Sequence, residues 1–234
     1  RFLKLQKEIR TTCRDLAMGI KGIIVMTPDL ENVMTAMKFN RIPTKWMSKS
    51  YPCLKPLGSY VQDLYKRLNW LHDWHHHGKP PTFWLSGFFF TQAFLTGAMQ
   101  NFARKYKIPI DTLTFDYDVL KVETKTSPPD DGVYCNGLYL EGARWEWREN
   151  TLVEQFPKVL IYAMPVIFFR PVGLVDVVEG SRYRCPLYKT AERKGTLSTT
   201  GHSTNYVVPL LLNTHVKASH WVKRSVALIC QTSD

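Results

Sequence analysis

The sequence lacks several features by which common protein classes are recognised. No uninterrupted apolar run reaches the roughly 20 residues of a membrane-spanning helix, because the most apolar stretch, residues 83–99, is broken by Ser86, Gly87 and Thr91. The charged first residues form no apolar signal-peptide core. The sequence contains neither a GxxxxGK[ST] phosphate loop nor a CxxC pair. These absences predict no membrane span and no nucleotide site. Because the sequence opens on Arg1 rather than Met, we also expect it to belong to a longer protein.

The cysteines are few and widely spread along the sequence. Their number is odd, and no two of them have the spacing of a metal or redox motif. This usage is typical of reduced intracellular thiols that fill the core. We therefore expect no disulfide framework. The five residues are Cys13, Cys53, Cys135, Cys185 and Cys230.

Acidic residues are scarce in only one half of the protein. Residues 1–109 contain 17 Lys and Arg against 6 Asp and Glu, whereas residues 110–234 contain 14 of each kind. The whole formal net charge of +11 therefore lies in the first half. Because a basic surface favours acidic partners, the two halves are expected to face different partners. With 44% hydrophobic residues and seven Trp, the protein is expected to fold rather than remain disordered.

The first half has the periodicity of amphipathic helices. Leu5, Ile9 and Leu16 belong to an apolar series that recurs at steps of three and four. Thr27 and Pro28 supply an N-cap and a first-turn proline for a second helix. The same spacing predicts two further helices, over residues 57–78 and 91–107.

From Leu113 onward the apolar period changes to two, as expected for half-buried strands. Short strands separated by clusters of Pro, Gly, Asp and Asn favour an antiparallel barrel or sandwich. We predict an α+β fold, with a helical subdomain over residues 1–109 and a small antiparallel β-barrel of about six strands over residues 110–234. A short helix is expected near Leu152 to Phe156. The expected strands begin at Leu113 and continue with Val133 to Leu140, Val159 to Phe169, Arg182 to Lys189, Tyr206 to Asn213 and Trp221 to Cys230.

A polar segment lies between the expected strands at residues 182–189 and 206–213, and it carries most of the candidate site residues. Its side chains favour turns in which they bond their own backbone, so we expect an ordered loop or a contact surface. His202 is interpreted as a neutral side chain within a buried polar network. The candidates in this segment are Ser198, Thr199, Thr200, Gly201, His202 and Asn205.

The obvious candidates for a metal site or a catalytic site lack the required arrangement. His75, His76 and His77 would point about 100° apart on a helix and could not all reach one ion. Cys135 or Cys185 could be combined with His202 as a thiol hydrolase, but nothing in the sequence places them together. We therefore predict no catalytic residue, no metal and no cofactor in this protein segment.

Arg144 and Trp145, in the string EGARWEWRE, are candidates for an interaction surface. Arginine and tryptophan on a small barrel are also typical of proteins that bind single-stranded nucleic acid by stacking and phosphate contacts. Acidic residues surround this string, however, and the excess of basic residues lies in the helical half. The main interpretation therefore involves no nucleic acid and no membrane. A basic barrel that binds single-stranded nucleic acid is the alternative interpretation.

Several long strings together resemble the C-terminal region of dynein heavy chains. They are FWLSGFFFTQAFLTGAMQNFARKYKIPIDTL, EGARW, CPLYKTAERKGTLSTTGHSTN and HWVKRSVALICQ, and they occur in the order found in that family. The axonemal members, of cilia and flagella, are the most similar, and FFFTQAFLTG resembles the inner-arm type. The resemblance extends from about Ile9 to Gln231, which is nearly the whole sequence.

The resemblance implies a non-catalytic domain at the end of an ATPase motor. Such a domain is expected to pack on the ATPase ring of its own heavy chain and to modulate minus-end-directed force generation on microtubules. ATP and Mg would belong to the parent motor, and other dynein subunits and microtubules would be met through that parent. The implied location is the cytoplasm and cytoskeleton, in the axoneme of cilia or flagella. Whether the first helix completes the last module of the ring is left open.

Overall fold

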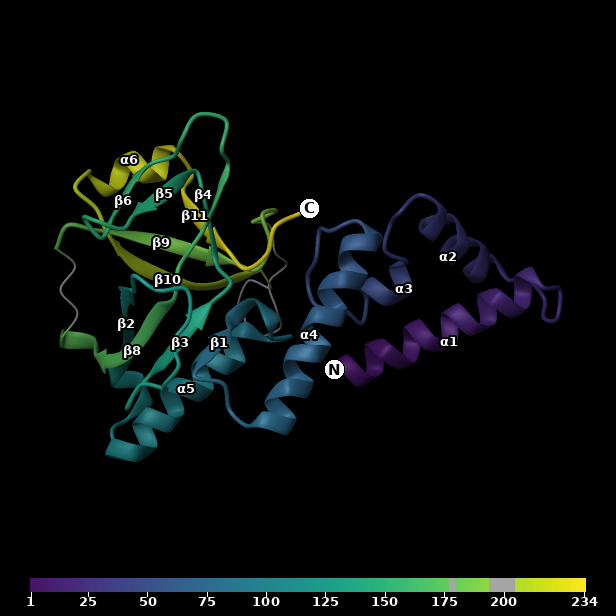
Figure 1. Ribbon diagram of the computed structural model, residues 1–234, viewed down its shortest axis with the longest axis horizontal. Coiled ribbons are helices and arrows are strands. Elements are labelled where there is room, and N and C mark those ends of the chain that lie inside the picture. The colour runs from purple at the N-terminus through teal and green to yellow at the C-terminus, as the bar shows by residue number, and fades with distance from the viewer. Residues whose placement is uncertain (177–179, 194–204) are drawn as a thin grey trace. The chain divides into compact units, whose positions relative to one another are not determined.

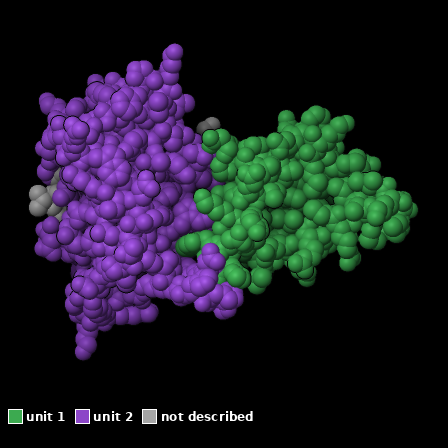
Figure 2. Space-filling view, viewed as in Figure 1, with its two compact units in different colours: residues 1–72, 233–234 green, residues 73–232 purple. Residues whose placement is uncertain are grey.

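The computed structural model describes residues 1–176, 180–193 and 205–234 (Figure 1). The protein forms two compact units, which Figure 2 distinguishes by colour. Unit 1 contains residues 1–72 and 233–234, and unit 2 contains residues 73–232. None of the helices in the described ranges is both long and apolar enough to span a membrane.

Unit 1 is built from helices, as the spacing of its apolar residues predicts. It contains α1 (Phe2–Ile20), α2 (Pro28–Lys38), α3 (Thr44–Met47) and the first part of α4 (Leu57–His77). Helix α1 packs against α2 and α3. Thr27 caps α2 as predicted, since its hydroxyl accepts a hydrogen bond from the Leu30 amide at 3.4 Å.

A buried arginine organises the core of unit 1. The side chain of Arg67 on α4 is 1% exposed, and its Nε donates to Asp63 Oδ2 at 2.7 Å. The Tyr51 hydroxyl donates to the same carboxylate oxygen at 2.7 Å, and the guanidinium carbon lies 3.9 Å from the centre of the Tyr51 ring. A buried charge of this kind is tolerated only where it is paired and hydrogen-bonded. The pairing therefore fixes the segment before α4 against that helix.

Unit 2 begins with the last residues of α4 and continues with a strand, a helix and further strands. After β1 (Thr82–Trp84) and a 3-10 turn (Leu85–Gly87), helix α5 (Thr91–Tyr106) packs beside β2 and β10. A second 3-10 turn (Ile110–Thr112) leads into the sheets, and a third covers Leu174–Asp176. The remaining elements are β2 (Leu113–Val119), β3 (Val133–Asn136), β4 (Tyr139–Glu141), β5 (Ala143–Glu146), β6 (Thr151–Glu154), β7 (Ile161–Ala163), β8 (Ile167–Gly173), β9 (Arg182–Tyr188), β10 (Tyr206–Asn213), α6 (Ala218–Lys223) and β11 (Ala227–Ile229).

The strands form mixed sheets, so the prediction of a closed antiparallel barrel is wrong for the described residues. One sheet has four strands in the order β1-β3-β8-β2, and a second has five in the order β10-β9-β11-β4-β7. A separate hairpin pairs β5 with β6. Parallel pairs join β1 to β3 and β9 to β11, and the other pairs are antiparallel. The α+β class, with helices first, is confirmed.

Four expected elements differ from the observed ones. The run from Val133 to Leu140 is two strands, because Gly137 takes a left-handed conformation with φ 79° between β3 and β4. The run from Val159 to Phe169 is also divided, into β7 and β8 around Met164 and Pro165. The helix expected near Leu152 to Phe156 is strand β6, and the strand expected from Trp221 to Cys230 consists of α6 followed by β11. The last helix of the first half ends at Tyr106 and β2 begins at Leu113, but the division into subdomains at residues 109 and 110 stays a prediction.

An ion cluster joins the two larger sheets within unit 2. Asp116 on β2 accepts a hydrogen bond from Arg170 on β8 at 2.8 Å and another from Arg182 at the start of β9 at 2.7 Å. Asp116 and Arg170 are direct partners in the register of the first sheet, whereas β9 belongs to the second. Burial alone would raise the pKa of Asp116, but the hydrogen bonds from both arginines outweigh it and hold this pKa below its usual range.

Candidate functional site

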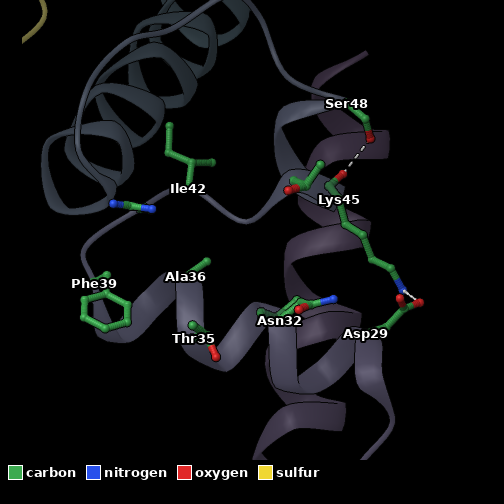
Figure 3. Close-up of a pocket in the computed structure, with 11 residues that line it drawn as sticks. Asp29, Asn32, Thr35, Ala36, Phe39, Ile42, Lys45 and Ser48 are labelled. Atoms are coloured by element: carbon green, nitrogen blue, oxygen red, sulfur yellow. Dashed lines mark hydrogen bonds and ion pairs between the residues drawn. The ribbon is translucent and has the colours of Figure 1, made fainter.

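A groove between α2 and the segment that leads into α3 is the candidate site (Figure 3). It lies within unit 1 and has a volume of about 730 Å³. This volume is within the range of about 300–1,000 Å³ that is usual for ligand sites. The lining residues are Asp29, Asn32, Val33, Thr35, Ala36, Phe39, Arg41, Ile42, Thr44, Lys45 and Ser48.

A left-handed residue at the end of α2 forms the groove. Asn40 has a φ of 54°, which ends the helix after Phe39 and turns the backbone around. The Asn40 side chain accepts a hydrogen bond from the Gly58 amide at 3.0 Å, and its carbonyl accepts one from Leu57 at 2.9 Å. Trp46 on α3 is 3% exposed and anchors the returning segment in the core. The turn and the start of α4 are therefore held together, and the returning segment forms the second wall.

The floor of the groove is apolar and its rim is mostly polar. Val33 is buried, while Ala36 and Ile42 are half-buried. Phe39 stands at one end of the groove with 63% of its surface exposed, and Figure 3 shows its ring beside Ala36. The lining contains no cysteine or histidine. An apolar floor with an exposed aromatic ring can hold an apolar side chain of a partner.

The charges at the two ends of the groove differ. At the N-terminal end of α2, Lys45 Nζ lies 2.6 Å from Asp29 Oδ2, as the dashed line in Figure 3 marks. The hydrogen bond from Lys45 to Asp29 raises the pKa of the lysine, which favours its charged form in this ion pair. At the other end, the Arg41 guanidinium has no hydrogen-bond or ion-pair partner among the described residues. The groove can therefore bind an anionic group at the Arg41 end.

Arg144 and Trp145 are adjacent on β5 but differ in surroundings. Trp145 is 2% exposed and belongs to the core, so its ring is covered in this fold and offers no stacking surface. Arg144 donates from Nη1 to Glu146 Oε2 at 2.7 Å, and its guanidinium carbon lies 4.4 Å from the centre of the Phe156 ring. Its buried Nε has no hydrogen-bond partner among the residues that the structure describes.

Asn205 is the only one of the six candidates in the polar segment that the structure describes. It lies just before β10 and is 4% exposed. Its Oδ1 accepts hydrogen bonds from the Thr190 amide at 3.0 Å and the Thr190 hydroxyl at 3.3 Å. The Asn205 carbonyl accepts a hydrogen bond from Lys189 at 2.8 Å. The other five, Ser198, Thr199, Thr200, Gly201 and His202, lie outside the described residues.

Sequence reasoning did not find the groove. It predicted a helix that starts at Thr27 and Pro28 but gave no role to Phe39 or Arg41. One signal was present in the sequence, since an aromatic residue and an arginine flank the asparagine that ends an amphipathic helix. That pattern becomes a site only when α3 folds back along α2, which no local spacing reveals.

Comparisons with known proteins identify the family. The family model for the C-terminal domain of the dynein heavy chain matches residues 1–230. Dynein axonemal heavy chain 12 of Mus musculus is 54% identical over 231 residues, and that of Homo sapiens is 53% identical over 234 residues. These matches include 99% and 100% of the present sequence, respectively, and 8% of each relative. Dynein axonemal heavy chain 1 of Rattus norvegicus is 50% identical over 232 residues, which is 98% of the present sequence and 5% of that relative.

The protein thus spans less than a tenth of the length of these relatives. The resemblance drawn from the strings around residues 83–113 and 185–205 is confirmed over almost the full sequence. The protein belongs to the family of C-terminal domains of dynein heavy chains, and its relatives include axonemal heavy chains.

Proposed function

We propose that this domain packs on the ATPase ring of its own axonemal heavy chain and modulates the force that the motor generates along microtubules. The observation that carries the proposal is the family match over residues 1–230, with 53–54% identity to axonemal heavy chain 12. The concentration of all the net charge in residues 1–109 supports a docking role for the helical half. The parent motor would act in the axoneme of a cilium or flagellum.

The physical basis of modulation is a change in the relative energies of ring states. A folded domain that contacts more than one module of a ring adds contacts that differ between its conformations. Such a domain shifts the populations of those conformations by the difference in contact energy. In this proposal ATP binding and hydrolysis, with Mg, belong to the ring. The domain contributes contacts rather than chemistry, and meets microtubules and other dynein subunits through the parent motor.

Charge reversal in the helical half tests the docking role. Lys4, Lys7 and Arg10 are exposed on α1 and make no ion pair with any described residue. Changing all three to Glu should weaken binding to a ring fragment about tenfold, if each removes an ion pair worth about 0.5 kcal/mol. The remaining binding should also depend less on salt, because fewer charge pairs are left to screen. Surface plasmon resonance over a range of NaCl concentrations measures both effects.

The matched control reverses three exposed lysines in the strand-rich half, Lys121, Lys158 and Lys217. We expect this variant to bind the ring fragment within about twofold of the unchanged domain, because single exposed charges outside an interface contribute little. An equal loss of binding in both variants would show that the charge asymmetry serves solubility only, and the docking role of the helical half would then be wrong.

A further inference from the structure

The groove between α2 and α3 has an uncompensated positive end. The Asp29–Lys45 pair occupies the end near the start of α2, and its charges cancel. At the opposite end lies Arg41, whose guanidinium has no ion-pair partner within the described part of the protein. Charge complementarity thus favours an occupant with a carboxylate at the Arg41 end, where a guanidinium can bind it through two hydrogen bonds.

The apolar part of the groove requires a second feature in the occupant. Val33, Ala36 and Ile42 are apolar lining residues, and Figure 3 shows the exposed Phe39 ring beside Ala36. A leucine, methionine or aromatic side chain would bury this surface, which is otherwise open to water. The occupant is thus a peptide segment in which an apolar anchor residue lies next to Asp or Glu.

The shallow groove favours a peptide segment that is tethered to this domain over one that binds from free solution. Eight of its eleven lining residues are exposed, so a short peptide would bury little area and would bind weakly from free solution. A segment tethered in the same polypeptide has a far higher effective concentration, of about millimolar for a short flexible connection. The relatives extend far beyond this region, since the match spans only 5 to 8% of their length. A polypeptide of that length is therefore able to supply a tethered occupant.

We propose that the α2–α3 groove is a docking site for an acidic segment of the same heavy chain, anchored by one apolar side chain against Phe39 and Ile42. This inference rests on the proposed function, because it requires the domain to lie at the end of a motor heavy chain. It goes beyond the proposed function because it names the groove that makes the contact, the recognition residues Phe39 and Arg41, and the acidic segment that binds there.

Site-specific photocrosslinking in the full-length heavy chain tests the assignment. Phe39 is replaced by p-benzoylphenylalanine, and the crosslinked peptides are identified by mass spectrometry. We expect crosslinks to a segment of the same heavy chain that contains Asp or Glu next to an apolar residue. Adding Arg41→Glu should reduce this crosslink at least about tenfold, because it places like charges together.

Two controls accompany this experiment. The same photoreactive residue at Tyr65, which is 67% exposed on α4 and outside the groove, should not capture that segment. The charge reversal Arg148→Glu, at an exposed residue between β5 and β6, should leave the Phe39 crosslink within about twofold, because Arg148 does not line the groove. Loss of the Phe39 crosslink in both charge variants would show a general charge effect and would overturn the role of Arg41.

A lysine-reactive crosslinker separates failure of the groove assignment from failure of the proposed function. If this reagent links the domain to the ring but Phe39 captures no acidic segment, captures a segment without acidic residues or captures another polypeptide, the groove assignment is wrong and ring docking stands. If the reagent finds no link between the domain and the ring in the full-length protein, the proposed function is wrong; the groove assignment then stands only if Phe39 still captures an acidic segment of the same heavy chain.

Discussion

Next to the paired strands β9 and β10, the side chain of Asn205 holds Thr190 through hydrogen bonds. The buried Asn205 side chain accepts from both the amide and the hydroxyl of Thr190, while its own carbonyl continues the pairing through Lys189. The polar composition of the segment that ends at Asn205 predicted that its side chains form hydrogen bonds. Which side chain would make those bonds could not be predicted, because Asn205 becomes buried only through the long-range pairing of β9 with β10.

Replacing Asn205 with Ala should lower the free energy of unfolding by about 1–3 kcal/mol, because the amide and the hydroxyl of Thr190 lose their acceptor in a buried place. Chemical denaturation followed by circular dichroism measures this loss. The matched control is Asn213→Ala at the exposed end of β10, which should change stability by less than about 0.5 kcal/mol. Equal effects in the two variants would contradict the role given to the Asn205 side chain.

The carboxylate of Asp116 is expected to make stability depend on acid pH. Because the arginines hold its pKa below the value in the unfolded state, its contribution is complete above the unfolded pKa of about 3.9 and is lost as the pH falls through the folded pKa. Asp116→Asn should therefore reduce stability at pH 7 and have a smaller effect at pH 3, below the unfolded pKa. Thermal unfolding at both pH values measures the difference, and Asp111→Asn, at an exposed residue, is the control. A loss of the same size at both pH values would contradict this linkage.

Elements whose conformation depends on local contacts could be predicted from the sequence. Elements whose conformation depends on contacts between distant residues could not. The spacing that places Leu5 and Leu16 on the buried face of α1 is a property of the helix itself. By contrast, β6 was expected to be helical, yet Leu152 is 1% exposed in a strand that pairs with β5. The short helix α6 was not predicted for a similar reason. Within its six residues, the buried Trp221 fits both the helical period and the strand period.

The turn between β3 and β4 depends on a glycine. A Cβ atom on Gly137 would lie 2.3 Å from Trp84 Cδ1, and its φ of +79° is unfavourable for other residues. Gly137→Ala should lower stability by at least about 1–3 kcal/mol, through backbone strain and the displaced indole. Gly97→Ala in α5 should have the opposite sign, a gain of up to about 1 kcal/mol, because nothing lies within 4 Å and alanine favours helix. Denaturant melts of both variants check the pair, and a Gly137 variant as stable as the parent would disprove the contact.

For the whole molecule, the α+β class and the family could be read from the sequence, while the sheet topology could not. Alternation identified the residues of β2, β9 and β10, but not their neighbours. The sequence offered no reason to pair β1, next to the helices, in parallel with β3 some fifty residues later. Such pairings are decided by how the apolar faces pack together, which is a property of the complete fold. The groove was missed for the same reason, since its walls come from two elements joined by a turn.

The proposed division of labour in the parent motor predicts that the isolated domain does not bind ATP. Isothermal titration calorimetry with Mg·ATP should show no binding in the micromolar range, because the sequence has no phosphate loop. A full-length heavy chain measured in parallel provides the positive control. A micromolar affinity in the isolated domain would require a nucleotide site of its own, and the assignment of all ATP chemistry to the ring would then be wrong.

The position of β11 has a consequence for the order of events during synthesis. This strand comprises residues 227–229, yet it lies in the interior of the five-stranded sheet, between β9 and β4. Before β11 leaves the ribosome, the sheet therefore exists as two separate parts, β10 with β9 and β4 with β7. Each part has an open edge where β11 will pair. Until residue 229 emerges, β9 and β4 can pair with the wrong strands, including those of neighbouring nascent polypeptides. For this domain, wrong pairing of β9 and β4 therefore stays possible until β11 has emerged and taken its place between them.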